Sequence, residues 1–178
     1  MKKTLKIFGI GLFIFIVLFF LIGAFLPKKY HVERSIVIAQ PDSVVYQYLT
    51  NFNNFNNWSP WHDVEPNIKY KIEGKEDTVG SRYSWEGNKT GEGYMQITQL
   101  TPFKLIEQKL VFKKPMEDQA MASFVLSQEN NTTKLTWNMD GENKTTLSRW
   151  FCTIMNMDKM IGKDYEKGLH RLKQQLEK

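Results

Sequence analysis

The order of apolar and polar positions divides the 178-residue chain into two parts. Residues 7–26 form an unbroken apolar run, with three lysines just before it and two just after it. A helix of that length, at about 1.5 Å per residue, is about 30 Å long and matches the hydrocarbon core of a bilayer. We therefore predict one N-terminal membrane anchor, residues 1–27, and a separate domain over residues 28–178.

A cleaved signal peptide is the alternative for this run. Signal peptides usually have a shorter apolar region and small residues at the cleavage site. Here Gly23-Ala24 is followed by Phe25-Leu26-Pro27, which is a poor cleavage context, and no cysteine follows directly to accept a lipid. The sequence therefore favours an uncleaved, single-pass anchor. Lysines flank the run on both sides, but a short basic N-terminus before the first span favours a domain outside the cytoplasm.

The domain begins with short elements. Residues 30–38 are rich in β-branched and aromatic side chains, which predicts a strand. Pro41 follows at a position that favours a helix start, and apolar residues then recur at helical spacing up to Leu49. Residues 50–61 mix aromatic residues with asparagines, and asparagine favours turns and caps, so we expect only short helical pieces there.

After residue 68 the pattern becomes strand, turn, strand. The predicted strands cover residues 68–72, 79–85, 93–100, 103–112, 118–128 and 133–139. Alternation places Val79, Tyr83 and Trp85 on one face of their strand, and Trp137 and Met139 on one face of the last strand. Short turns between strands of this length indicate an antiparallel meander.

A single long helix is predicted over residues 147–177. Its apolar side chains recur every three or four residues in one stripe, made of Met157, Ile161, Tyr165, Leu169, Leu172 and Leu176. A helix with one apolar face needs a sheet to cover that face. The expected fold class is therefore α+β: a helix-grip fold with a curved antiparallel sheet wrapped around a long C-terminal helix, preceded by one N-terminal transmembrane helix.

Three segments of the domain resemble a known superfamily. They are residues 32–38 with Pro41 and Val45-Tyr46, residues 57–61, and residues 157–169, of which the last is the most distinctive. Together they are similar to the START-like (SRPBCC) superfamily, in its branch of polyketide cyclase/dehydrase and lipid-transport proteins, over about residues 30–177. The resemblance implies an apolar cavity between the sheet and the C-terminal helix. It does not imply one activity, because one fold carries many functions.

Charge and composition exclude several classes of function. Three of the five net positive charges come from Lys2, Lys3 and Lys6 in the anchor, which holds no acidic residue, so the domain is close to neutral. Such a domain has no general electrostatic attraction for nucleic acid. The chain has one cysteine, so it forms no internal disulfide, and its three histidines lack metal-ligand spacing. We expect no metal, no cofactor and no nucleic-acid partner.

A cavity in this architecture is expected to have aromatic and methionine walls, which suit apolar ligands. For any one candidate, packing in the core is the simpler explanation, so the set counts for more than each member. The candidate ligand-binding residues are Trp58, Trp61, Tyr83, Trp85, Tyr94, Phe112, Trp137, Phe151, Met155 and Met160.

No catalytic residue is assigned. His62 and Asp63 are neighbours in sequence, and Ser59 lies close by, but no GxSxG nucleophile elbow is present. We interpret these three as polar residues of a surface loop. Cys152 is interpreted as a small buried hydrophobic residue. The remaining charged candidates are expected in cross-strand pairs on the outer face of the sheet, and they are Arg82, Glu92 and Glu107.

Three functions are compatible with the sequence. The preferred one is a membrane-anchored module that binds an apolar small molecule or lipid beside the bilayer. The second is a polyketide cyclase/dehydrase-like enzyme, which a polar pair pointing into the cavity would favour. The third is a stress or signalling domain with no ligand, which a cavity filled by its own side chains would favour.

Overall fold

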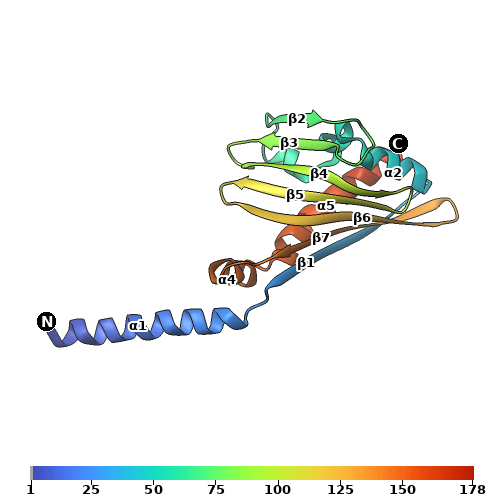
Figure 1. The fold of residues 1–178 in the computed structure, drawn as a ribbon. Coiled ribbons are helices and arrows are strands. Elements are labelled where there is room, and N and C mark those ends of the chain that lie inside the picture. The colour runs from blue at the N-terminus through green and yellow to red at the C-terminus, as the bar shows by residue number, and fades with distance from the viewer. Residues whose placement is uncertain (1) are drawn as a thin grey trace.

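The computed structural model describes residues 2–178 (Figure 1). The first helix, α1 (Lys2–Phe25), extends away from the rest of the molecule. Residues 3–25 are long and apolar enough to cross a membrane, and only 6% of the most apolar window is buried. This exposure excludes a helix of the domain core, whereas a signal sequence near the N-terminus can meet the same criteria of length and apolar composition.

The domain is built on one antiparallel sheet of seven strands in the order β1-β7-β6-β5-β4-β3-β2. Consecutive strands from β2 to β7 are neighbours, which confirms the predicted meander, and β1 closes the sheet beside β7. The strands are β1 (Lys29–Ile38), β2 (Lys69–Glu73), β3 (Arg82–Glu86), β4 (Glu92–Thr101), β5 (Leu105–Lys114), β6 (Asp118–Glu129) and β7 (Thr132–Glu142).

The helices lie between β1 and β2 and after β7. The first group consists of α2 (Asp42–Thr50), η1 (Phe52–Asn54), α3 (Phe55–Trp58) and η2 (Pro60–Asp63), which are the short pieces expected from the asparagine-rich tract. The second group is α4 (Thr146–Met155) and α5 (Met157–Leu176). Helix α5 crosses one face of the sheet (Figure 1), which gives the α+β helix-grip fold.

The predicted helix over 147–177 is two helices rather than one. Asn156 between them has a φ of 51°, in the left-handed region that asparagine tolerates better than most residues. Its side-chain oxygen accepts a hydrogen bond from the amide of Lys159 at 3.1 Å and so caps α5. Helix α4 has a cap of its own, a reciprocal box between Thr145 and Ser148. Apolar spacing alone did not reveal this break.

The third predicted strand also begins later than expected. Gly80 has a φ of 96° inside a turn, so residues 79–81 lie outside the strand and β3 begins at Arg82. Val79 is consequently exposed, whereas Tyr83 is buried on the inner face as predicted. Alternation cannot distinguish a strand from a turn that happens to share its period.

The core lies between the inner face of the sheet and α5. The ring of Trp137 on β7 stacks on Tyr165 of α5, with ring centroids 3.7 Å apart, and the ring of Trp58 meets Trp137 edge-on at 5.2 Å. A side chain on Gly168 would begin 3.1 Å from both Pro60 and Trp137. This glycine therefore lets α5 approach η2 and β7 closely.

The first strand is joined to α5 by an ion-pair network. Arg34 on β1 donates hydrogen bonds to Asp158 at 2.8 Å and to Glu166 at 2.7 Å. Gly162 lies between these two acidic residues on α5, and a side chain there would overlap the Arg34 guanidinium. The family resemblance is carried by the segments around Arg34, Trp58 and Gly162, and these segments therefore interlock. The resemblance thus reflects contacts that build the fold rather than residues that carry out chemistry.

Candidate functional site

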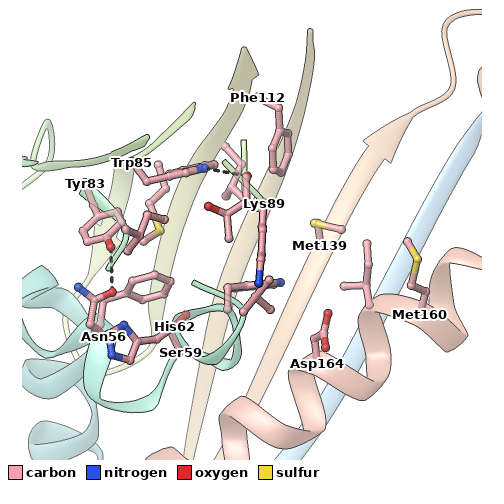
Figure 2. Close-up of a pocket in the computed structure, with 18 residues that line it drawn as sticks. Asn56, Ser59, His62, Tyr83, Trp85, Lys89, Phe112, Met139, Met160 and Asp164 are labelled. Carbon is pink, nitrogen blue, oxygen red and sulfur yellow. Dashed lines mark hydrogen bonds between the residues drawn. The ribbon is translucent and has the colours of Figure 1, made fainter. Parts of the chain in front are cut away.

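An apolar cavity lies between the sheet, the α3–η2 segment and the first turns of α5 (Figure 2). Its volume is about 350 Å³, within the usual size range of small-molecule sites. Strands β3, β4, β5 and β7 supply one wall. The inward-facing residues of that wall are Tyr83, Trp85, Met95, Leu110, Phe112 and Met139.

The alternation of the strands explains why these residues share one wall. In the register of the sheet, Trp85 pairs with Gly93 and Gly93 with Phe112, so the three lie side by side on the inner face. Because Gly93 has no side chain, the indole of Trp85 extends over β4 and meets Phe112 edge-on at 5.9 Å. The indole nitrogen donates to the carbonyl of Thr90 at 3.3 Å, which fixes the ring at the cavity wall.

Polar groups gather on one side of the cavity. Asn56, Ser59 and His62 lie there together, opposite Met139 and Met160 on the other side (Figure 2). The Nδ1 atom of His62 is buried and has no hydrogen-bond partner among the described residues. An unpaired buried nitrogen is costly, so it is suited to receive a polar group of a ligand or a water molecule.

A tyrosine hydroxyl completes this polar side. The hydroxyl of Tyr83 donates to the side-chain oxygen of Asn56 at 2.8 Å. Burial raises the pKa of Tyr83 to about 12, so the phenol stays protonated and keeps donating at neutral pH. The cavity is thus apolar over most of its wall, with one polar corner, and the charged residues Lys89 and Asp164 also belong to its lining.

The rim of the cavity is tied down by Glu65. Its carboxylate accepts backbone hydrogen bonds from Asn88, Lys89 and Thr90 at 2.8–3.1 Å, in the turn between β3 and β4. These bonds lower the pKa of the Glu65 carboxyl to about 2. Because Lys89 and Thr90 line the cavity, Glu65 holds the turn that forms part of its edge.

Five of the ten candidate residues line the cavity: Trp61, Tyr83, Trp85, Phe112 and Met160. Trp58 and Trp137 lie deeper, in the packed core beside a void of about 20 Å³. Trp85 and Trp137 thus share the inner face of the sheet, but of the two only Trp85 lines the apolar cavity.

The other three candidates lie away from the cavity. Tyr94 is on the outer face, where the Arg82 guanidinium lies over its ring at 4.4 Å, because its neighbours Gly93 and Met95 have the inward positions. Phe151 and Met155 belong to α4, and both are exposed. The break at Asn156 separates α4 from the helix that crosses the sheet, so these two do not reach the cavity.

Sequence reasoning missed the role of the loop after α3 in forming the cavity. It treated Ser59, His62 and Asp63 as surface polar residues, but Ser59 and His62 line the cavity. Asp63 points elsewhere and pairs with Lys167 at 2.7 Å and with Arg171. Hydrogen bonds from these two cations hold the pKa of the Asp63 carboxyl well below its usual range. The aromatic residues on both sides of this loop were the available signal.

Of the three charged residues expected in cross-strand pairs on the outer face, Glu92 has charged partners and Arg82 bonds to a neutral side chain, whereas Glu107 forms no side-chain hydrogen bond or ion pair with a described residue. Arg82 donates to Gln96 at 3.2 Å, and Glu92 pairs with Lys113 and Lys114 at 3.4 and 2.9 Å. These side chains point away from the cavity. Among the residues that the structure describes, no group of three or more His, Cys, Asp or Glu side chains is arranged to hold a metal ion.

Comparison with known proteins supports the fold and the family. A family model described as polyketide cyclase / dehydrase and lipid transport matches residues 29–177. A search of curated proteins found no match. Similar solved structures include a protein from Chromobacterium violaceum (13% identity, 86% of this chain and 99% of that one, TM-score 0.60) and a protein from Nitrosospira multiformis (19% identity, 83% and 96%, TM-score 0.60). The Aha1 dimer from Colwellia psychrerythraea is a third (21% identity, 83% and 96%, TM-score 0.56). At these identities the structures establish a shared fold only.

Proposed function

The chain belongs to the polyketide cyclase/dehydrase and lipid transport family. From that membership we propose that it is a membrane-anchored protein that binds an apolar small molecule or lipid in its internal cavity. The observation that carries this proposal is the cavity of about 350 Å³ with aromatic and methionine walls. Such walls provide contact area without a fixed polar pattern, so they accept apolar molecules of varied shape.

The polar corner refines the chemistry of the ligand. Asn56, Ser59 and His62 offer hydrogen-bonding groups at one side of a mostly apolar space, whose lining also includes Lys89, Thr90 and Asp164. A molecule with an apolar body and one neutral polar end satisfies both regions, and it would supply a partner for the buried Nδ1 of His62. A fatty acid in its protonated form, a fatty alcohol or a polyketide chain has this character.

The membrane anchor is part of the same proposal. The apolar run of residues 7–26, which α1 contains up to Phe25, lacks the cleavage context of a signal peptide. An uncleaved anchor keeps an apolar site next to the bilayer, which is the source of apolar molecules in a cell. Lysines lie on both sides of the span, and the short basic N-terminus before it favours a domain outside the cytoplasm.

A cyclase or dehydrase activity is the second candidate, and His62 is the observation that favours it. A general base in a cavity wall needs a partner that orients it. Asp63 does not provide this, because it is engaged with Lys167 and Arg171. Asp164 lies across the cavity from His62 (Figure 2). This arrangement supports a ligand hydrogen bond from His62 better than proton abstraction by it.

Native mass spectrometry of the full chain, released from bilayer nanodiscs, tests the binding function. Leu110→Trp places a large side chain in the cavity, whereas Val125→Trp adds the same bulk at a 41% exposed position. We expect the wild-type and Val125→Trp proteins to carry an apolar molecule and the Leu110→Trp protein to lose it. An empty wild-type protein, or a Leu110→Trp variant that keeps the molecule, would overturn the proposal.

A further inference from the structure

Helix α4 has an apolar face with no partner in the domain. None of its ten residues is buried. Leu147, Phe151, Ile154 and Met155 are 69, 49, 72 and 48% exposed, and their spacing of four, three and one puts them on one side of the helix. Exposed apolar side chains in such a continuous patch mark a surface that contacts something else.

The position of α4 indicates what that contact is. The ring of Trp150 stacks on Phe19 of α1 with centroids 5.4 Å apart, and its indole nitrogen donates to the carbonyl of Phe19 at 3.1 Å. At Gly23 the absent side chain leaves space for Thr146 and Trp150. Helix α4 therefore lies alongside the domain-proximal part of α1, as Figure 1 also shows.

We propose that α4 is a second membrane-contacting element, whose apolar face enters the bilayer leaflet that surrounds the domain-proximal part of α1. This inference rests on the anchor in the proposed function, because only a bilayer around α1 reaches the neighbouring face of α4. Both helices carry exposed apolar side chains and touch through Phe19 and Trp150, so lipid that surrounds α1 at this contact also reaches α4. Amphipathic helices with large apolar side chains commonly lie at this depth.

The polar groups of α4 are arranged for this environment. The Thr145–Ser148 box satisfies the backbone amides of these two residues at the start of the helix. Arg149 directs its guanidinium to the carbonyls of Asn143 at 3.3 Å, of Gly23 at 3.5 Å and of Ala24 at 3.4 Å, towards the domain end of α1. A cationic side chain near lipid usually extends in this way towards the membrane–water interface, where its charge is solvated.

The contact also sets where the cavity faces. Met160 lines the cavity, is 40% exposed, and follows the end of α4 by about one and a half helical turns. Insertion of α4 therefore holds the rim near Met160 close to the membrane surface. An apolar molecule leaving the bilayer then has a short path past α4 to the cavity.

Spin labelling of the full chain in nanodiscs of mixed zwitterionic and anionic phospholipid tests the inference. In a Cys152→Ala background, one label is placed at Phe151→Cys or Ile154→Cys on α4. Val17→Cys on α1 reports on the anchor, and Lys134→Cys, exposed near the far end of β7, is the matched aqueous control. Accessibility to oxygen, which partitions into lipid, is compared with accessibility to a water-soluble nickel chelate.

We expect the oxygen-to-nickel accessibility ratio of the α4 labels to resemble that of Val17→Cys and to exceed that of Lys134→Cys several-fold. If the α4 labels have the accessibility ratio of Lys134→Cys while Val17→Cys is in lipid, α1 is a membrane anchor but the inference that α4 contacts the bilayer fails. If Val17→Cys is also in water, the anchor itself fails. Labels on α4 that are protected from both reagents and show dipolar broadening would assign the face to a second copy of the chain and overturn the membrane contact.

Discussion

At the residue scale, Glu65 determines how firmly the cavity rim is held. Its carboxylate accepts hydrogen bonds from the backbone amides of residues 88–90. The folded-state pKa of about 2 lies below the ordinary value of 4.5, so this stabilisation is complete above about pH 4.5 and is lost as the pH falls towards 2. We expect Glu65→Gln to lower the melting temperature near pH 7. The difference in melting temperature between this variant and the wild type should shrink as the pH falls from 5 to 2. Thermal unfolding across this pH range measures it.

The matched control for that experiment is Glu117→Gln. Glu117 is exposed in the turn between β5 and β6, and no side-chain hydrogen bond or ion pair of it is found in the described part of the chain. The control should melt like the wild type at each pH. A Glu65→Gln effect that stayed constant down to pH 2 would show that the carboxylate charge is not what holds the turn.

Gly162 allows a second test at this scale. Alanine normally stabilises a helix interior by about 1 kcal/mol relative to glycine. At Gly162, however, the added methyl would overlap the Arg34 guanidinium, so we expect Gly162→Ala to destabilise the protein. In an Arg34→Ala background the overlap is gone and the same substitution should become neutral or stabilising. Chemical denaturation of the four proteins measures this double-mutant cycle, and a destabilisation that is independent of Arg34 would contradict the explanation.

Single residues also mark the limit of what sequence could predict for the site. Tyr94 is chemically as suitable as Tyr83, but its place in the strand alternation puts it on the outer face. His62 reaches the cavity because η2 packs between the sheet and α5, which is a tertiary arrangement without a local signal. Residue type therefore predicted the chemistry of the walls, whereas register and loop packing decided which residues form them.

At the scale of elements, periodicity predicted all seven strands and the helical C-terminus. It missed the break at Asn156, because apolar residues continue at helical spacing across it. That break creates α4 as an element distinct from α5, and with it the contact to α1. An asparagine in the left-handed conformation between two capped helices can be recognised only from its backbone dihedral angles.

The division between anchor and domain is tested by a chain that begins at Lys28. Contacts across this boundary are few: Asn143 donates to the carbonyl of Pro27, Arg149 donates to the carbonyls of Gly23 and Ala24, and α4 packs on α1. The core between the sheet and α5 uses none of residues 1–27. We expect the shortened chain to unfold in one cooperative thermal transition followed by circular dichroism. A molten protein with gradual unfolding would show that α1 is part of the folded unit.

At the scale of the whole molecule, the account combines an apolar cavity, an apolar helix and an amphipathic helix beside it. The fold and family followed from the three interlocking segments, because these positions make the contacts between β1, η2 and α5. The volume of the cavity could not be predicted, since it depends on how completely the inner side chains fill the space under the sheet. The central claim is that this space takes up an apolar molecule from the bilayer.

The most direct test is photo-crosslinking of the full chain in nanodiscs that contain a fatty acid with a diazirine in its acyl chain. Peptide mass spectrometry then locates the adducts. The account predicts adducts on the peptides that carry Met95, Leu110 and Met139, their loss in Leu110→Trp, and unchanged adducts on α1 in both proteins. Adducts confined to α1 and α4, or cavity adducts that persist in Leu110→Trp, would contradict it.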